Sequence, residues 1–416
     1  MDDEKQRASS ARAVFARLLL PAAVGCATGA GVGLLAGAFE DRGLQALSHA
    51  PAYAAVAASA LALIATYVVV RAFGLAGKPS GSELYIEAYL RSDHIPAREV
   101  PGRISAAIAT VGLGGSQGFE AASALLGSAL GDAAGRLRRL ALAPEDNRAL
   151  MAAGASAGIA AVFSSPAIGL LYGLEVPYRR DIDARPLVPA AVAAACAYGT
   201  RVAVAGAHPL VELHTLPSFD LPFAAGCVAV GIACGLGGRV FAATQSLLHR
   251  LGRSLGAPVR VISASALLAL LAWCGFALSG SWITLGPGHI AATWLDGAAA
   301  APAALIAAIL VVRTAGTLVC VYGGGGGGVF TALACTGLFI GELGGRALGH
   351  HTSALSFIGA ACFLSAGYRI PLSCMLWLGE ASGDLTFTLG GAVAVAVAQV
   401  FAGDASVSDA KRDARD

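Results

Sequence analysis

Residues 154–175 read GASAGIAAVFSSPAIGLLYGLE, and residues 359–380 read GAACFLSAGYRIPLSCMLWLGE. The two stretches lie 205 residues apart and share Gly-Ala, proline and glutamate at identical spacing. Each predicts a small-residue helix, a break at the proline, and a second apolar helix that ends in a glutamate. Paired interrupted apolar helices in two halves of a chain indicate a membrane transport site.

A glycine-rich break precedes each copy of this unit. The first runs from Gly114 to Phe119, and the second contains six consecutive glycines and ends at Phe330. Glycine destabilises a helix interior by about 1 kcal/mol relative to alanine, so both breaks are predicted to be unwound. The next helix then begins with free N–H groups and roughly half a positive charge, which favours a bound anion. If the halves are inverted, both breaks should converge near the midplane and hold a permeating anion weakly enough to release it.

The composition predicts an all-α polytopic membrane protein. Of 416 residues, 56% are hydrophobic and 13% are charged, whereas a soluble domain carries about a quarter charged residues. Stretches such as Pro51–Val70 and Ala301–Cys320 are long enough to cross a hydrocarbon core of about 30 Å. Other apolar segments are too short to span upright, so they are expected to tilt or to stop at the midplane. The alternating segments of a β-barrel are absent from the sequence.

The chain is expected to divide into a cytoplasmic tail (1–12), a first membrane repeat (13–206), a second membrane repeat (207–402) and a polar, disordered tail (403–416). The predicted apolar segments are 13–39, 50–74, 103–113, 117–131, 148–163, 166–177, 187–206, 220–248, 258–279, 301–320, 329–348, 355–367, 371–380 and 386–402. Basic residues cluster at segment ends, which predicts a multi-pass membrane protein with a cytoplasmic N-terminus.

Charge and cysteine content limit the alternatives. A net charge of +2 gives no indication of nucleic-acid binding, and nine scattered cysteines without a CxxC predict neither a disulfide nor a metal site. No cofactor is expected. An enzymatic function is the alternative, because Gly154–Gly158 superficially resembles an intramembrane serine-protease loop. The corresponding part of the second copy, however, has no serine. A non-enzyme is therefore expected, and a protease assay with Ser156→Ala separates the two classes.

Five stretches then recur in a specific order: Ser80–Glu87, Gly115–Phe119, Ser165–Glu175, Arg313–Thr317 and Gly328–Ala332. In order and spacing they resemble the anion-site motifs of the CLC family of chloride channels and chloride/proton antiporters, over about residues 15–402. The resemblance implies a homodimer in the lipid bilayer, with one anion pore per subunit built from two inverted repeats of tilted and broken helices.

Departures from the family pattern carry the functional prediction. The gate glutamate of the GREGP motif is replaced by Gln117, and the second glutamate of the antiporters, just after Glu175, is replaced by Val176. The pore tyrosine falls by register at Val407. The GSGIP motif is degraded, and no proline follows Phe330.

The resemblance also implies the site residues. The residues expected to hold the anion or line the pore are Gln117, Gly118, Phe119, Gly328, Val329, Phe330, Gly81 and Ser82. Glu120 and Glu175 are the candidates for a gate or proton carrier. Glu120 is expected on the same helix face as Gln117, either as a displaced gate or as a first-turn acid favoured by the helix dipole. Structural roles are favoured for the paired Glu175 and Glu380, for His289 and for Arg313, which is expected to bond an internal acid or carbonyls.

The predicted function is passive, proton-uncoupled anion conduction, with chloride as the default ion. The alternative is an anion/proton antiporter that uses another acid, such as Glu120 or Glu83.

Overall fold

A computed structural model describes residues 15–77, 80–137, 142–206, 217, 220–349 and 352–412. Within these ranges the chain is helical, and the only β-type pairings are two isolated bridges. The helices are η1 (Phe15–Leu19), α2 (Leu20–Leu35), η2 (Ala36–Gly43), α3 (Leu44–Ser48), α4 (Ala52–Ala72), α5 (Gly81–Arg91), α6 (Val100–Gly112), α7 (Glu120–Gly135), α8 (Pro144–Phe163), α9 (Pro166–Glu175), α10 (Leu187–Ala205), α11 (Leu221–Ser254), α12 (Ala257–Ser279), α13 (His289–Asp296), α14 (Ala303–Gly323), α15 (Phe330–Leu348), α16 (Thr352–Tyr368), α17 (Pro371–Ser382) and α18 (Leu385–Ala402).

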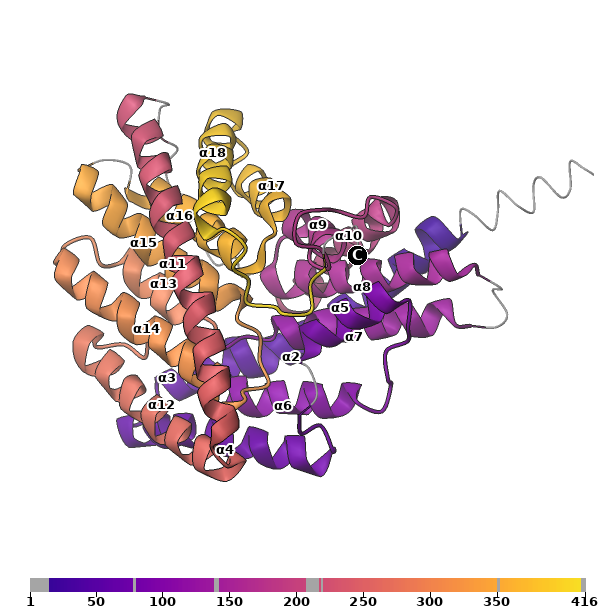
Figure 1. The fold of residues 1–416 in the computed structure, drawn as a ribbon, viewed down its shortest axis with the longest axis horizontal. Coiled ribbons are helices and arrows are strands. Elements are labelled where there is room, and N and C mark those ends of the chain that lie inside the picture. Colours follow the sequence, from indigo (N-terminus) through magenta and orange to yellow (C-terminus); the bar gives the residue numbers. More distant parts are fainter. Residues whose placement is uncertain are drawn as a thin grey trace, which may run out of the picture.

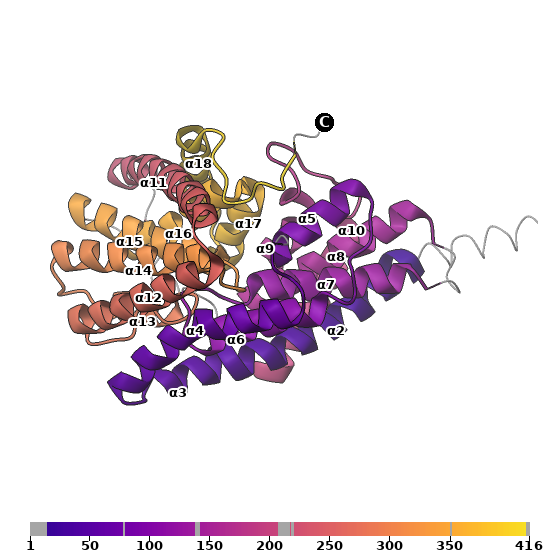
Figure 2. The same ribbon diagram turned by 60° about the horizontal axis from the view of Figure 1, so that its bottom comes forward.

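The two halves of the chain repeat one arrangement of helices. α7 packs on α8 and α10 on α2 in the first half, while α15 packs on α16 and α18 on α11 in the second. The halves lie side by side, the first indigo to magenta and the second red to yellow (Figures 1 and 2). The predicted all-α architecture of two repeats of broken helices is therefore confirmed. The expected boundary at residues 206 and 207 falls where the described residues stop, and the expected tail 1–12 lies outside them.

Close glycine contacts hold the central helices of each half together. A Cβ added to Gly154 would lie 2.0 Å from the Gly127 carbonyl oxygen, and one added to Gly359 would lie 2.3 Å from that of Gly337. No larger residue fits at such crossings, which let the backbones approach. The small-residue helices of the repeated unit are thus explained by packing.

Seven helices among the described residues are long and apolar enough to cross a membrane by length and composition. Most predicted segments match an observed helix to within a few residues, but α5 and α13 were not among them and α11 extends to Ser254, beyond the predicted end at residue 248. Two further differences concern the first half. The first apolar segment continues through the π-helix η2 and ends at Ser48, beyond the predicted end at residue 39. The segment predicted from residue 117 begins as a helix only at Glu120.

A break follows α8 and another follows α16, and the helix after each break, α9 or α17, is capped by a glutamate from the other half of the chain. The Glu175 carboxylate, at the end of α9, accepts bonds of 2.8 Å from the N–H groups of Leu372 and Ser373 at the start of α17. The Glu380 carboxylate, in the last turn of α17, accepts bonds from the Ser165 hydroxyl and the Ala167 N–H at the start of α9. A carboxylate at a helix N-terminus satisfies free N–H groups and complements the dipole. Each glutamate therefore caps a helix in the other half of the chain.

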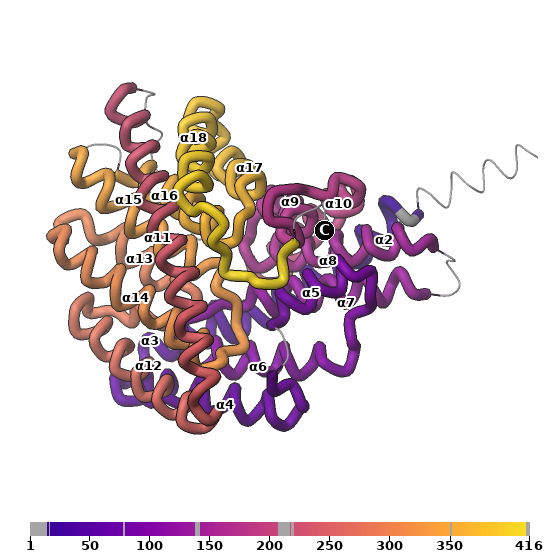
Figure 3. Tube along the Cα trace, in the orientation of Figure 1, coloured from indigo at the N-terminus to yellow at the C-terminus, as the bar shows by residue number. Residues whose placement is uncertain are grey.

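The C-terminal tail does not match the prediction of disorder. Residues 403–412 cross the surface of the second half and reach the loop after α9 (Figure 3). The Val407 N–H donates to the Gly367 carbonyl at 2.9 Å, and the Gln245 side chain donates to the Val407 carbonyl at 3.0 Å. Arg412 forms a parallel bridge with Tyr178. Polar composition predicted disorder, but backbone bonds to distant segments fix this stretch.

Candidate anion-binding site

The two glycine breaks meet, as the sequence predicts. The Gly118 N–H donates to the Gly328 carbonyl at 3.0 Å, and the Gly328 N–H donates to the Gly118 carbonyl at 2.7 Å. This antiparallel bridge joins residues 210 positions apart and places the starts of α7 and α15 together. It also engages the Gly118 N–H, which was expected to be free for an anion.

The Glu120 carboxylate lies against this bridge. Its Oε1 atom accepts a 2.7 Å bond from the Thr331 backbone N–H at the start of α15. The residue is only 2% exposed, and its Oε2 atom is buried without a hydrogen-bond partner in the described structure. A carboxylate therefore occupies the helix N-terminus that was predicted to hold the anion.

Positions 118 and 328 have to be glycine, because the Glu120 carboxylate fills the space that a side chain would take there. A Cβ on Gly118 would lie 2.7 Å from both Glu120 carboxylate oxygens, and a Cβ on Gly328 would lie 2.6 Å from Oε2. Real Cβ atoms do not approach so closely, so these positions form a cradle around one small negative group. The glycines signalled such a site in the sequence, but not which group fills it.

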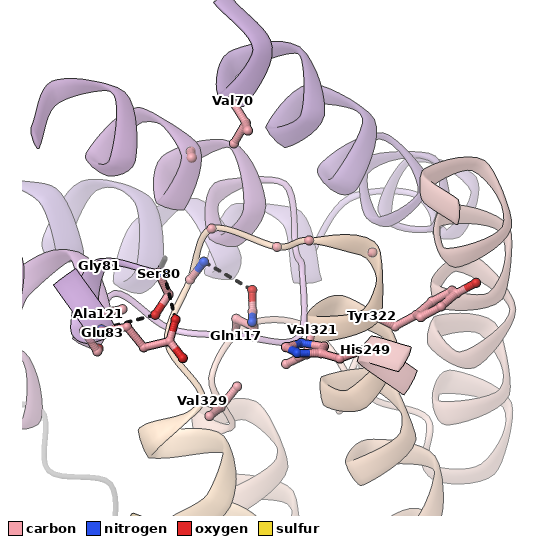
Figure 4. Close-up of a pocket in the computed structure, with 18 of the residues that line it drawn as sticks. Val70, Ser80, Gly81, Glu83, Gln117, Ala121, His249, Val321, Tyr322 and Val329 are labelled. Carbon is pink, nitrogen blue, oxygen red and sulfur yellow. Dashed lines mark hydrogen bonds between the residues drawn. The ribbon is translucent and has the colours of Figure 1, made fainter. Parts of the chain in front are cut away.

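The Gln117 side chain lies in a different place from the Glu120 carboxylate. Its amide oxygen accepts a 3.2 Å bond from the Gly327 N–H, and the side chain lines a water-accessible cavity (Figure 4). The expectation that Gln117 and Glu120 share a helix face is wrong, because α7 begins after Gln117.

A second carboxylate holds the start of α7. The Glu40 Oε2 atom, from η2, accepts a 3.4 Å bond from the Phe119 N–H, and Oε1 lies 3.5 Å from the His289 Nε2 atom. Glu40 was not identified from the sequence, because nothing in its local pattern connects it with a residue 79 positions away. His289 was assigned a structural role.

Arg313 fixes the loops next to the site through hydrogen bonds. Its buried guanidinium donates to the Ser116 hydroxyl, to Thr317 Oγ1 at 3.0 Å and to the Gly286 carbonyl at 2.8 Å. The expectation of a packing role with carbonyl partners is confirmed. These bonds tie the loop before α7 to the loop before α13, which carries His289.

The cavity beside Gln117 has a volume of about 590 Å³ and opens from the bridge towards the ends of α4 and α11. The predicted residues Gly81, Ser82, Gly328 and Val329 line its inner end, together with Tyr368 and Val407. Its basic lining residues are Arg71, Arg103, His249, Arg253 and Arg260. The acid Glu83 is engaged in a capping box with Ser80. The cavity is thus a predominantly basic vestibule ending at the bridge.

The Phe330 ring belongs to the core. It is 1% exposed and packs edge-on against Phe163 and Tyr172, with Tyr368 alongside. Any role of Phe330 in anion binding therefore falls to its backbone. Phe119 is likewise 1% exposed, and its N–H faces Glu40.

Comparison with known proteins gives three kinds of match. Residues 61–403 match the family described as voltage gated chloride channel. A chloride/fluoride channel protein of Pseudomonas syringae pv. tomato is 31% identical over 252 residues, covering 58% of this chain and 55% of the relative. The chain thus matches about half the length of that relative.

Three solved structures share the fold. A CLC-type fluoride/proton antiporter has a TM-score of 0.79 at 21% identity, covering 96% of this chain and 98% of that one. A slow cyanobacterial Cl⁻/H⁺ antiporter has a TM-score of 0.75 at 20% identity, covering 92% and 94%. A eukaryotic CLC transporter has a TM-score of 0.73 at 16% identity, covering 94% and 72%.

Proposed function

Because this chain belongs to the voltage gated chloride channel family, we propose that it conducts a small anion passively across the plasma membrane through the bridge between Gly118 and Gly328. The family assignment confirms the resemblance inferred from the motifs. Chloride is the default ion. The similar proteins include some named for chloride and some for fluoride, so fluoride is the first competitor to test.

The observation that carries this proposal is the position of Glu120. A carboxylate that accepts the Thr331 N–H occupies the place of an anion at the start of α15. Its departure frees that N–H and the cradle between the two glycines. Glu120, and not Gln117, is then the gate, and the backbone around Gly118, Phe119, Val329 and Phe330 holds the ion.

Two observations support passive conduction over proton coupling. Val176 cannot carry a proton, and the Glu175 carboxylate is engaged by three donors at the start of α17. In addition, Glu175 is not among the residues that line the vestibule. A proton that reaches Glu120 would find the Glu175 carboxylate already engaged as a helix cap and no acid at position 176 to carry it onward.

The test is anion flux from proteoliposomes with parallel proton recording. Wild-type flux should rise on acidification, whereas Glu120→Gln should conduct several-fold faster at neutral pH and lose the acid response. Glu87→Gln, which changes a half-exposed acid on α5, is the matched control and should behave as wild type. A Glu120→Gln variant that folds and retains the full acid response would falsify the gate assignment.

Anion/proton antiport through Glu120 is the second candidate. It is favoured by the buried carboxylate at the site and by two similar structures that are antiporters. Uphill proton movement driven by an anion gradient in the wild-type protein would select it over passive conduction.

The assembly and orientation are part of the same proposal. We expect a homodimer that is not an enzyme, with the N-terminus and the basic vestibule on the cytoplasmic side. Arg71 lines the vestibule and lies at the end of the second predicted span. The second span returns the chain to the membrane face where the first span begins, so the vestibule opens on the same side as the N-terminus.

A further inference from the structure

We propose that Glu40 and His289 form the proton input to Glu120, so that the gate is protonated from the side of the bridge opposite the vestibule. This inference rests on the proposed function, because it assigns the residues that regulate the same site. The three side chains come from η2, α13 and α7.

The three groups form a graded path from the surface to the gate. The His289 side chain is 33% exposed, and its Nε2 atom lies 3.5 Å from Glu40 Oε1. Glu40 is 6% exposed, and its Oε2 atom accepts the N–H of Phe119, the residue adjacent to Glu120. Glu120 is 2% exposed, and its Oε2 atom has no hydrogen-bond partner among the described residues. That buried, unpartnered oxygen is the position where a proton would be received.

Within the part of the chain that the structure describes, His289 is the cation paired with Glu40, and no ion pair involves Glu120. The Asp41 carboxylate also interacts electrostatically with His289, but it is paired with the Arg201 guanidinium at 3.0 Å. Arg313 is engaged by Ser116, Thr317 and the Gly286 carbonyl. Tyr172 and Tyr368 are the remaining titratable groups that interact with Glu120. The Glu40 carboxylate interacts electrostatically with Glu120, and like charges repel strongly in a low-dielectric site.

The backbone around both relay residues is specialised. Glu40 lies in a π-helix, a form that is rare and often found at functional sites. Gly288, with φ of 139°, begins α13 and so positions His289. Arg313 fixes the preceding loop through Gly286. These features hold an acid and an imidazole together across 249 residues of sequence.

The proton movement balances without any co-reactant. Protonated His289 gives its proton to the Glu40 carboxylate and becomes neutral. The Glu40 acid then gives the proton to the Glu120 carboxylate and returns to its charged form. Neutral Glu120 no longer competes with the anion for the N–H groups of α15, and the reverse transfer closes the gate.

The test is the midpoint pH of anion flux in proteoliposomes, over about pH 4 to 7 where carboxylates and histidine titrate. Removing the negative charge in Glu40→Gln makes Glu120 harder to protonate, so the midpoint should fall by about one pH unit, a tenfold change in proton affinity. Removing the cation in His289→Gln leaves Glu40 uncompensated, so the midpoint should rise.

Opposite shifts show that Glu40 and His289 set the proton affinity of Glu120, whereas a merely structural contact would lower flux in both variants without moving the midpoints apart. His94→Gln, whose imidazole bonds Asp132 away from the site, is the matched control. Midpoints that stay at the wild-type value, or that move in the same direction in both variants, would overturn the proposal.

A second readout does not depend on transport. In infrared difference spectra of the purified protein, the carboxylic-acid band lost in Glu120→Gln should shift in Glu40→Gln. If flux is absent but this shift is seen, the proposed function fails and the relay stands. If flux is acid-gated and the shift is absent, the relay alone fails.

Discussion

At the scale of single residues, the site is defined by what fills a helix N-terminus. The sequence predicted free N–H groups at the starts of α7 and α15, and the structure places the Glu40 and Glu120 carboxylates there. A carboxylate and a small anion satisfy the same N–H groups and the same dipole. An acid in this position therefore makes access to the site depend on its protonation and on its movement.

Replacing Gly328 tests the cradle. In Gly328→Ala the new Cβ would lie 2.6 Å from Glu120 Oε2 and 2.9 Å from the Ala121 nitrogen, so the carboxylate has to move. We expect altered gating, with flux at neutral pH changed several-fold and the acid response weakened, while the protein remains folded. Flux and its pH profile in proteoliposomes measure this.

The control for Gly328→Ala is Gly199→Ala on α10, where an added Cβ meets nothing within 4 Å. It should leave flux unchanged and stabilise α10 slightly, because alanine is the better helix former by about 1 kcal/mol. Unchanged gating in a correctly folded Gly328→Ala would mean that Glu120 does not occupy the cradle.

At the scale of elements, the repeated unit owes its stability to contacts between the halves. The glutamate that ends α9 caps α17, and the glutamate near the end of α17 caps α9. Identical spacing in the two copies is therefore a requirement of the cap geometry. Neither break is capped by its own half alone.

Removing either cap should destabilise the protein without closing the pathway. We expect Glu175→Ala and Glu380→Ala each to cost about 1–2 kcal/mol, the range of a lost helix cap, measured by thermal unfolding in detergent. Glu87→Ala, on the half-exposed face of α5, should cost little. If Glu175→Gln instead abolishes the acid response, Glu175 carries protons and its assignment as a cap is incomplete.

Much of this element structure follows from local patterns. Proline at the start of α9 and α17, glycine after α14 and long apolar runs were enough to place most helices, because these signals act within a few residues. Glu40 and His289 could not be placed this way, since 249 residues separate them and no periodicity connects them. The expected shared helix face of Gln117 and Glu120 was wrong, because Gln117 lies in the break before α7, next to the bridge between Gly118 and Gly328.

At the scale of the whole molecule, the docked tail closes one wall of the vestibule. Val407 and Ser408 line the cavity beside Tyr368. Lys411 is 3% exposed and donates to the backbone carbonyls of Tyr368 and Tyr178. Burial lowers the pKa of the Lys411 ammonium to about 7, although the nearby Glu175 carboxylate opposes this shift.

Docking of the tail should therefore depend on pH. A released Lys411 titrates near its ordinary pKa of about 10.4, so between about pH 7 and 10 release takes up a proton and rising pH favours the docked state. Below about pH 7 lysine is charged in both states, and the dependence levels off. Proteinase K cleavage within residues 403–412 should slow as pH rises through this range.

The control is Lys411→Met, which carries no titratable group and corrects for the pH dependence of the protease at each point. The ratio of wild-type to variant cleavage should fall from neutral to alkaline pH. A constant ratio would show that Lys411 does not control docking.

The docked tail also limits how the protein can be handled. Residues 403–412 reach the loop after α9 through backbone bonds, and Arg412 still pairs with Tyr178. A tag or reporter inserted within residues 403–412 would displace a segment that forms part of the vestibule wall. The flux of such a variant should therefore differ from that of the protein in which residues 403–412 stay docked.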